Sequence, residues 1–142
     1  MSKQTIRSIR KRISSVKVRH DGILQIDIDA GEEFGFMDMQ DLIDAAQQLG
    51  DGKKFLNLIK LGEYTLLDYE ARTFSASRIG SEFKIADAFV INSLSQKIVT
   101  NFYLKFHKPV VPTKIFTDTP KALEWLREIG KKDKKDGSHR VA

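Results

Sequence analysis

Two short stretches of the sequence carry most of the side chains suited to binding another molecule, and each follows an apolar run. The first stretch spans 63–70 and the second contains residues 92 and 93. In an open α/β sheet, binding groups gather where parallel strands end and helices begin. We therefore predict a partner-binding surface formed by Glu63, Tyr64, Thr65, Asp68, Tyr69, Glu70, Asn92 and Ser93.

Two of these residues also have a purely structural explanation. Ser93 can cap the helix that follows it, an interaction worth about 1 kcal/mol. Asn92 is a common turn residue after a strand. At the level of sequence, recognition and local structure both stay open for this pair.

An excess of apolar side chains marks a second candidate site. The predicted helix 93–107 has a broad apolar stripe formed by Leu94, Ile98, Val99, Phe102, Tyr103 and Phe106. One packed helix face cannot hide all of them. The remainder is suited to a hydrophobic ligand cleft, a dimer surface, or a thick core under the loop 30–37. Under the ligand hypothesis the binding residues are Phe34, Phe36, Phe102 and Phe106.

Residues for catalysis or metal binding are sparse. The histidines His20, His107 and His139 are far apart in the sequence, and no His-x-x-x-His pair, phosphate-binding loop or nucleophile elbow is present. His107 ends a predicted helix, where a cation would stabilise the last carbonyl groups. The Asp-x-Asp-x-Gly run at 27–31 lacks the further ligands of a calcium loop. We predict no catalytic residue, no metal site, no cofactor and no enzymatic activity.

Composition indicates a single soluble domain. The 142 residues suffice for one hydrophobic core, and the absence of cysteine is typical of an intracellular protein. No apolar run reaches the roughly 20 residues of a membrane span, and the N-terminus lacks the apolar core of a secretory signal. We expect a cytoplasmic protein with no transmembrane segment.

The basic residues concentrate at the two ends of the chain. The net charge is +5, yet residues 1–20 hold seven basic and no acidic side chains, and residues 130–142 hold five basic and two acidic ones. The body between them is therefore mildly acidic, which argues against a basic surface for nucleic acid. We expect no specific nucleic-acid binding.

The apolar pattern predicts a β-hairpin followed by repeated strand–helix units. Alternating apolar residues flank Asp21-Gly22, a dipeptide that favours tight turns. Near-continuous apolar runs indicate buried parallel strands, and helical spacing with capping residues indicates helices. The predicted strands are 12–19, 23–29, 55–61, 88–91 and 114–116, and the predicted helices are 38–49, 68–78, 93–107 and 119–129, with Asp38, Ser93 and Thr119 as N-caps.

These elements define an α/β domain in which a β-hairpin precedes the strand–helix units. The central sheet should be mostly parallel, with about five strands and four helices, and its crossovers should be right-handed. We expect a flexible basic N-terminus at 1–11, the domain at 12–129, and a disordered basic tail at 130–142.

This order of elements resembles the STAS domain, the SpoIIAA-like fold of anti-sigma-factor antagonists, and in particular small uncharacterised bacterial STAS-like domains. The resemblance spans 12–129 and is carried by the segments VKVRHDGILQIDI, FVINSLSQKIVTNFYLKFHKP and IFTDTPKALEWL. It implies a SpoIIAA-like fold and a regulatory role through protein binding.

The antagonists carry an Asp-Ser-Ser-Gly-like motif in which a partner kinase phosphorylates a serine. At the matching position this sequence reads Asp68-Tyr69-Glu70-Ala71, so only the aspartate is kept. Glu70 could supply one fixed negative charge where a phosphoserine would bring about −1.5 to −2. Its negative charge could equally stabilise the helix by interacting with the positive end of the helix dipole. The departure puts a kinase-dependent switch in doubt.

Two functions remain open. The first is a non-enzymatic regulatory module that binds a protein partner or a second copy of itself, and it predicts solvent-exposed Tyr64 and Tyr69. The alternative is a carrier or sensor of a small hydrophobic or lipid-like ligand, held between helix 93–107 and loop 30–37. That alternative predicts a closed cavity lined by Phe34, Phe36, Phe102 or Phe106.

Overall fold

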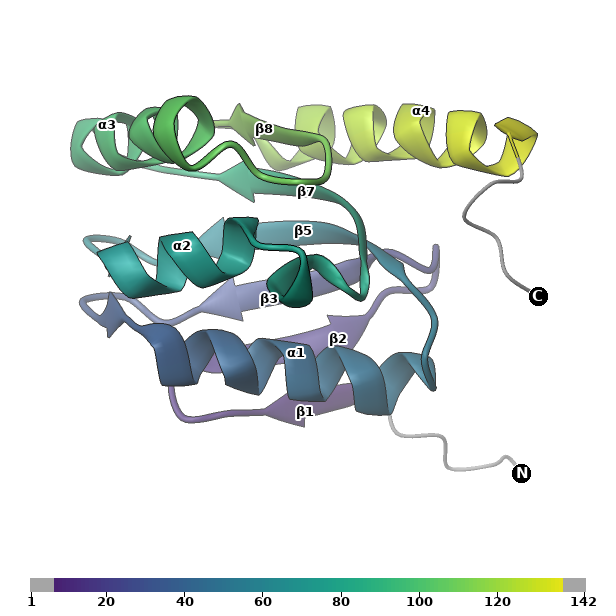
Figure 1. Cartoon of the computed structure of the whole chain (residues 1–142), viewed down its shortest axis with the longest axis horizontal. Helices are drawn as coiled ribbons and strands as arrows, with labels where there is room; N and C mark the ends of the chain where they lie inside the picture. The colour runs from purple at the N-terminus through teal and green to yellow at the C-terminus, as the bar shows by residue number, and fades with distance from the viewer. Residues whose placement is uncertain (1–6, 137–142) are drawn as a thin grey trace.

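The computed structural model describes residues 7–136, which form a six-stranded sheet covered by helices (Figure 1). The strand order is β1-β2-β3-β5-β7-β8. These strands are β1 (Ser8–Arg10), β2 (Ser14–Val18), β3 (Leu24–Ile28), β5 (Phe55–Leu61), β7 (Lys84–Val90) and β8 (Thr113–Phe116). Two further strands pair in parallel as a separate short ribbon, namely β4 (Glu33–Phe34) and β6 (Leu66–Leu67).

Four α-helices complete the fold. They are α1 (Phe36–Gly50), α2 (Tyr69–Ala76), α3 (Leu94–Phe102) and α4 (Thr119–Asp136). A 3₁₀ turn follows α2 at Ile79–Ser81. α3 continues directly into a π-helical turn at Tyr103–His107. Figure 1 shows α1 and α2 lying across the near face of the sheet.

The pairing of strands confirms the predicted α/β architecture. β2 and β3 form the expected antiparallel hairpin, with Val16 opposite Ile26. Gly22 in its turn has a φ of 86°, a conformation that glycine adopts without steric cost. β3, β5, β7 and β8 then pair in parallel, so the sheet is mostly parallel.

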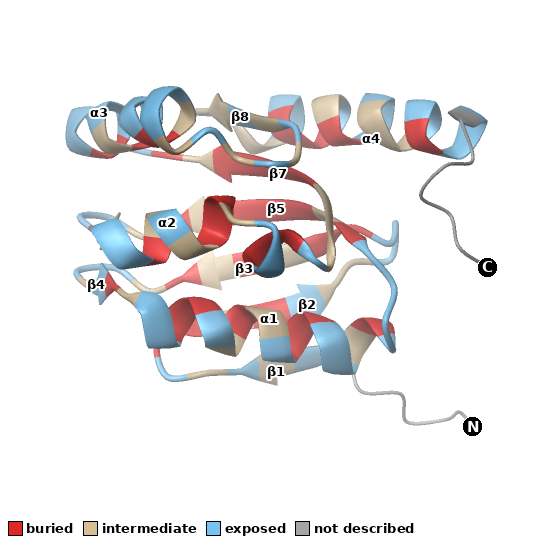
Figure 2. Ribbon diagram, viewed as in Figure 1, coloured by how far each residue is buried: buried red, intermediate tan, exposed pale blue. Residues whose placement is uncertain are grey.

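Side-chain alternation divides the hydrophobic core into two layers. Ile59 of β5 and Phe89 of β7 belong to the core beneath α1 and α2, whereas their neighbours Leu58 and Ala88 belong to the core beneath α4. Successive strand residues point to opposite faces of a sheet, which explains this division. Figure 2 shows the resulting concentration of buried residues in β5 and β7. Both central strands are therefore buried on both faces.

The N-terminal prediction was wrong where the structure can be compared with it. We expected residues 1–11 to be flexible, but Ser8–Arg10 form the edge strand β1, which pairs antiparallel with β2. Ile9 lies opposite Val16, so the apolar residue of this basic segment extends the hairpin. This strand raises the sheet to six strands. Residues 1–6 lie outside the described part of the chain.

The predicted end of the last helix was also wrong. We expected α4 to stop before Gly130 and a disordered tail to begin there, but α4 continues to Asp136. Ile129 packs against the core, and Asp133 is buried one turn later, so contacts with the domain outweigh the roughly 1 kcal/mol by which glycine disfavours a helix. Residues 137–142 lie outside the described part.

The predicted N-caps were partly right. The Ser93 hydroxyl accepts a hydrogen bond from the Gln96 amide at 3.2 Å, as expected. α1 begins earlier than predicted, at Phe36, and Asp38 lies inside its first turn, where its carboxylate accepts from the Gly35 amide at 3.0 Å. At α4 the capping oxygen belongs to Asp118, which accepts from the Lys121 amide at 3.1 Å, rather than to Thr119.

Candidate functional site

The predicted binding residues lie where β5 and β7 end, and several of them have structural roles. Thr65 is fully buried; its hydroxyl donates to the Asp29 carbonyl and accepts from the Glu32 amide at 3.0 Å. The Asn92 amide group donates to the Leu61 carbonyl at 3.0 Å. Together with Ser93, the cap of α3, these side chains hold the edge of the sheet in place.

Gln96 joins these loops. Its side chain is fully buried, and its oxygen accepts from the Asn92 amide at 2.9 Å. Its nitrogen donates to the Gly62 and Thr65 carbonyls at 2.8 and 2.9 Å. One side chain of α3 therefore fixes the turn between β5 and β6.

Gly62 marks a close approach of two backbones at the same edge. A Cβ atom at this position would lie 2.5 Å from the backbone nitrogen of Ala30 and 2.6 Å from the Ile28 carbonyl oxygen. Real Cβ contacts are longer, so only glycine lets the turn after β5 lie against the end of β3. The loop that carries Glu63 and Tyr64 is consequently rigid at its base.

The other predicted binding residues are accessible. Tyr64 and Tyr69 have exposed fractions of 79% and 65%, in keeping with the interaction hypothesis. Glu63 and Glu70 are exposed as well. Asp68 is the N-cap of α2 and accepts from the Ala71 amide at 2.8 Å. The aspartate shared with the antagonist motif thus has a structural role here.

The outward face of α3 exposes a row of large apolar side chains. Leu94, Ile98, Phe102 and Phe106 are 72%, 61%, 45% and 61% exposed. Of the predicted stripe, Tyr103 is buried, together with Gln96 and Thr100 on the adjoining face. The exposed row is the part of the stripe that we expected one packed face to leave over. Tyr69 of α2 lies at the end of the row. We call the five exposed residues Tyr69, Leu94, Ile98, Phe102 and Phe106 the α3 patch.

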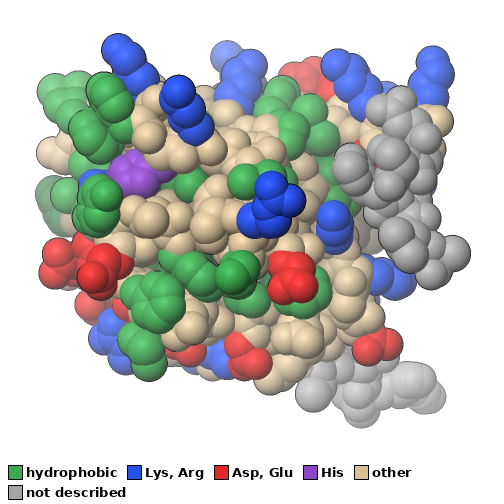
Figure 3. Space-filling model, viewed as in Figure 1, with side chains coloured by type: hydrophobic (Ala, Val, Ile, Leu, Met, Phe, Trp, Pro, Cys, Tyr) green, Lys and Arg blue, Asp and Glu red, His purple; other side chains and the backbone are tan. Residues whose placement is uncertain are grey.

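Ring contacts join α2 to the end of α3. The His107 ring lies 5.3 Å from the Tyr69 ring and 5.9 Å from the Phe102 ring, measured between centroids. The Arg72 guanidinium lies 5.8 Å from the Phe102 ring. Figure 3 shows hydrophobic side chains gathered around the histidine, over α3 and α2. The α3 patch is therefore one surface built from two elements.

The surroundings of His107 disfavour its charged form. Burial lowers the pKa of His107, and the nearby charge of Arg72 lowers it further. The expected role, a cation that stabilises the last carbonyl groups of the helix, therefore does not fit the observed environment. The imidazole instead contributes a ring to the aromatic contacts, among them Tyr103 at 5.8 Å.

The four phenylalanines of the ligand hypothesis are not brought together. Phe34 is fully buried in the core. Phe36 packs its ring against Phe74 at 4.9 Å. Phe102 and Phe106 point outward in the α3 patch, with their ring centroids 4.5 Å apart. None of the four lines the interior cavity described next.

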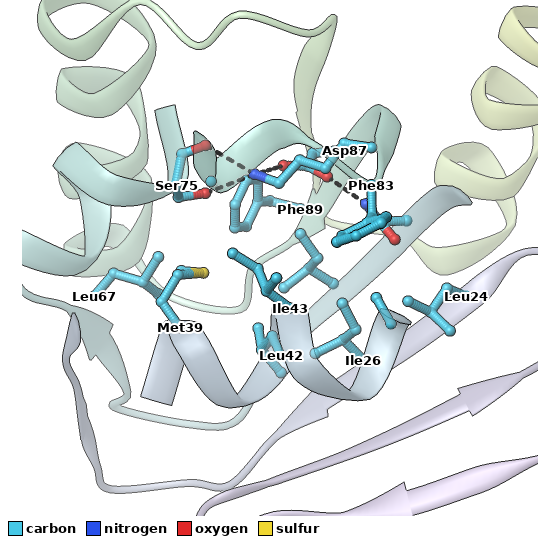
Figure 4. Close-up of a pocket in the computed structure, with 15 residues that line it drawn as sticks. Leu24, Ile26, Met39, Leu42, Ile43, Leu67, Ser75, Phe83, Asp87 and Phe89 are labelled. Atoms are coloured by element: carbon cyan, nitrogen blue, oxygen red, sulfur yellow. Dashed lines mark hydrogen bonds and ion pairs between the residues drawn. The ribbon is translucent and has the colours of Figure 1, made fainter. Parts of the chain in front are cut away.

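A small cavity lies between α1 and the sheet and has one polar end (Figure 4). Its volume is about 40 Å³, room for only a few water molecules. Its walls are mostly apolar and include Leu24, Ile26, Met39, Leu42, Ile43, Leu67, Phe83 and Phe89. The polar end consists of Asn57, Ser75, Lys84 and Asp87.

The polar end is a closed network of buried groups. The Lys84 ammonium lies 2.9 Å from the Asp87 carboxylate and donates to the Ser75 hydroxyl at 2.8 Å and to the Ser75 carbonyl at 2.9 Å. Asn57 donates to the other carboxylate oxygen of Asp87 at 2.9 Å. Tyr103 donates to the Ser75 hydroxyl at 3.1 Å. Burial, and then the charge of Asp87, raises the pKa of Tyr103, so its hydroxyl keeps its proton.

This network has no feature of a catalytic serine site. The Lys84 ammonium donates two hydrogen bonds to Ser75 and forms an ion pair with Asp87, and its side chain is only 11% exposed. The Ser75 hydroxyl accepts from two donors, and its side chain is buried. We did not predict this network from the sequence. Its signal is that Asn57 and Asp87 interrupt apolar runs, and the structure places them as direct partners across β5 and β7.

The described residues show neither a metal-binding cluster nor a membrane-spanning helix. Within residues 7–136, no group of three or more histidine and acidic side chains is arranged to hold a metal ion. In the same range, no helix is both long enough and apolar enough to cross a membrane.

Comparison with known proteins bears on the fold. A family model described as "Domain of unknown function (DUF7793)" matches residues 16–130. A comparison with curated proteins found no match. The chain is similar to a crystal structure of an uncharacterised DUF3478-family protein with a SpoIIAA-like fold from Shewanella loihica PV-4, with a TM-score of 0.55 and 18% sequence identity. That match covers 89% of this chain and 98% of the other, and it confirms the SpoIIAA-like fold.

Proposed function

We propose that this chain, which belongs to the DUF7793 family of domains of unknown function, is a non-enzymatic STAS-like module that acts by binding a protein. The observation that carries the proposal is the α3 patch. Leu94, Ile98 and Phe106 each leave more than half of their surface to solvent. Contiguous exposed apolar side chains of this kind mark interaction sites in soluble proteins.

The way in which α3 is fixed to the domain supports a binding role for the α3 patch. The buried face of α3 is held by Gln96 and Tyr103, so the exposed row is presented on a fixed helix rather than on a mobile loop. A surface that is ordered before binding loses little conformational entropy when a partner docks. Tyr64, Glu63 and Glu70 extend the exposed surface beyond the patch.

The interior offers less support for a ligand carrier. Pockets for small molecules usually measure about 300–1,000 Å³, whereas the cavity beneath α1 is about 40 Å³. A second interior cavity beside Tyr103 is about 10 Å³. Two open surface hollows measure about 380 and 410 Å³, but none of the four phenylalanines lines either of them. The protein-binding function is therefore the one we propose.

A non-enzymatic role is supported by the buried polar network. Lys84, Asp87 and Asn57 bind one another and Ser75. The cavity beside the network measures about 40 Å³, which is too small for a substrate larger than a few water molecules. Cytoplasmic action belongs to the same proposal and follows from the cysteine-free composition.

Paired affinity purification tests the proposed function. Three baits are compared in extracts of the source organism: the wild-type chain, Ile98→Glu/Phe106→Glu, and Ile79→Glu. Ile79 is 71% exposed on the 3₁₀ turn and is the matched control outside the α3 patch. Circular dichroism checks that all three baits are folded, which the exposure of the substituted side chains leads us to expect.

The expected result is a protein retained by the wild-type and Ile79→Glu baits and lost from the double variant. A buried glutamate in an apolar interface would be unpaired and costly. The proposal fails if the double variant retains the same proteins as the wild type, or if the wild type retains neither another protein nor a second copy of the chain above empty resin.

A further inference from the structure

We propose that the α3 patch binds the α3 patch of a second copy of this chain, so that the protein forms a two-fold symmetric dimer. This inference rests on the proposed function and names its partner. In a two-fold dimer a surface meets itself, so each of its features must be matched by another feature of the same surface. The α3 patch meets this requirement in its apolar centre and at its charged borders.

The apolar centre has the form of a helix ridge. Leu94, Ile98 and Phe102 follow one another in steps of four residues, and Phe106 continues the row into the π-helical turn. Ridges of this spacing interdigitate when two helices cross at about −50°. With a two-fold axis along the row, α3 of one copy would cross α3 of the other, and the two ridges would lie beside each other.

Basic side chains border the row on the α3 side. Lys97 lies on α3, Lys105 lies in the π-helical turn and Lys108 follows it, and all three are exposed. The Lys105 ammonium is 5.6 Å from the centre of the Phe106 ring, so this charge is adjacent to the apolar row. In Figure 3, Lys and Arg side chains stand above the hydrophobic group at the upper left.

Acidic side chains border the patch on the α2 side. Glu70 is next to Tyr69 in the first turn of α2, and Glu63 lies in the turn fixed by Gln96; both are exposed. Figure 3 shows Asp and Glu side chains gathered below the same hydrophobic group. The two borders therefore carry opposite charges on opposite sides of one apolar surface.

A two-fold axis that runs along the apolar row, in the plane between the two copies, exchanges the two borders. The basic border of one copy then faces the acidic border of the other, and the reverse contact occurs once more by symmetry. Opposite charges across an interface steer association and fix the register of the two partners. The patch is thus complementary to itself in charge as well as in shape.

Other occupants match only one border. An anionic lipid surface attracts basic side chains, and so does a nucleic acid backbone, but either would be repelled by Glu63 and Glu70. A second copy of the chain satisfies both borders without any further assumption.

Native mass spectrometry of the full chain over a series of protein concentrations tests this dimer. Three charge variants are prepared: Lys97→Glu/Lys105→Glu, which makes both borders acidic; Glu63→Lys/Glu70→Lys, which makes both basic; and Lys132→Glu, a control at an exposed position of α4. We expect the wild type and the control to dimerise with the same Kd. Each border variant alone should dimerise at least about tenfold more weakly, because like charges would face each other.

A mixture of the two border variants is the decisive sample. The substitutions change the mass of each chain by only a few daltons, so one of the two variants is uniformly labelled with ¹⁵N. A mixed dimer is then distinguished from either homodimer, and opposite charges predict that the mixed dimer forms preferentially. The inference is overturned if the wild type stays monomeric over the series, or if Ile98→Glu/Phe106→Glu leaves its dimer unchanged. It is also overturned if the mixed dimer is not favoured. A monomeric wild type that still retains another protein in the paired purification would leave the proposed function intact.

Discussion

The buried charge of Asp87 should make a large contribution to the stability of the domain. It lies in β7 with no exposed surface, between the Lys84 ammonium and the Asn57 amide. Replacing it with alanine would leave a buried cation without its partner. Breaking a buried pair in this way costs about 3–5 kcal/mol. We predict a loss of that size in the free energy of unfolding of Asp87→Ala, measured by urea denaturation.

The matched control for that measurement is Asp29→Ala. Asp29 pairs with Arg10, and the two side chains are 35% and 55% exposed. Surface pairs are worth about 0–1 kcal/mol, so this variant should unfold close to the wild type. Equal losses in the two variants would contradict the structural importance that we assign to the buried network.

His107 makes stability depend on pH. Its pKa is lowered in the folded chain by burial and by Arg72, while in the unfolded chain it titrates near the ordinary value of about 6.5. As pH falls through that value, the unfolded chain takes up a proton that the folded chain resists. The free energy of unfolding should therefore decrease as pH falls from about 8 to 5.

The variant His107→Gln should lose this part of the pH dependence, as measured by urea denaturation at several pH values. His20 provides the control, because it is exposed in the hairpin turn, and His20→Gln should keep the dependence of the wild type. An unchanged slope in His107→Gln would show that another group is responsible.

At the scale of elements, Gln96 connects α3 to the loop that carries the exposed Glu63 and Tyr64. Gln96→Ala would remove both donors to the Gly62 and Thr65 carbonyls. Leaving buried polar groups unpaired costs about 1–3 kcal/mol. We predict a loss of this size in thermal or urea unfolding, and faster hydrogen exchange at residues 62–66. Gln47→Ala, on the exposed face of α1, should change stability by less than about 0.5 kcal/mol.

The elements themselves were largely predictable from the sequence, but the orientation of α3 was not. The spacing of apolar residues along the sequence predicted β5, the β2–β3 hairpin and all four helices. The helix that begins after Ser93 has two adjacent candidate faces, and its more apolar row, with Ile98, faces solvent. Gln96 and Thr100 lie on the buried face, where backbone carbonyls of other elements satisfy the Gln96 amide. A hydrophobic pattern cannot show that a polar face has partners inside the protein.

Tertiary contacts explain the remaining errors at the chain ends. Ser8–Arg10 become a strand because β2 offers an unpaired edge. α4 continues past Gly130 because the sheet lies beneath it: a Cβ on that glycine would touch a Leu56 methyl carbon at 3.0 Å. Local propensity favours neither outcome. The carboxyl-edge location of the candidate site was predicted, whereas the α3 patch depends on the orientation of a helix.

At the scale of the whole molecule, the fold separates stability from recognition. The two core layers and the Lys84–Asp87 network hold the domain together without any exposed group. The α3 patch contributes little to that core and leaves large apolar side chains in solvent. Substitutions such as Ile98→Glu should therefore abolish partner binding with little change in the unfolding midpoint, when the midpoint is measured at a dilution where the wild type is monomeric. Loss of both together would contradict this separation.

Hydroxyl-radical footprinting tests the central claim, that the α3 patch is a protein-binding surface, most directly. The oxidation of Phe102, Phe106 and Tyr69 would be compared between the isolated chain at high dilution and the chain in a concentrated native extract. Ile79 and Met37, exposed outside the patch, correct for scavenging by the extract. We predict selective protection of the three patch residues. Equal reactivity of patch and control residues in both samples would contradict the claim.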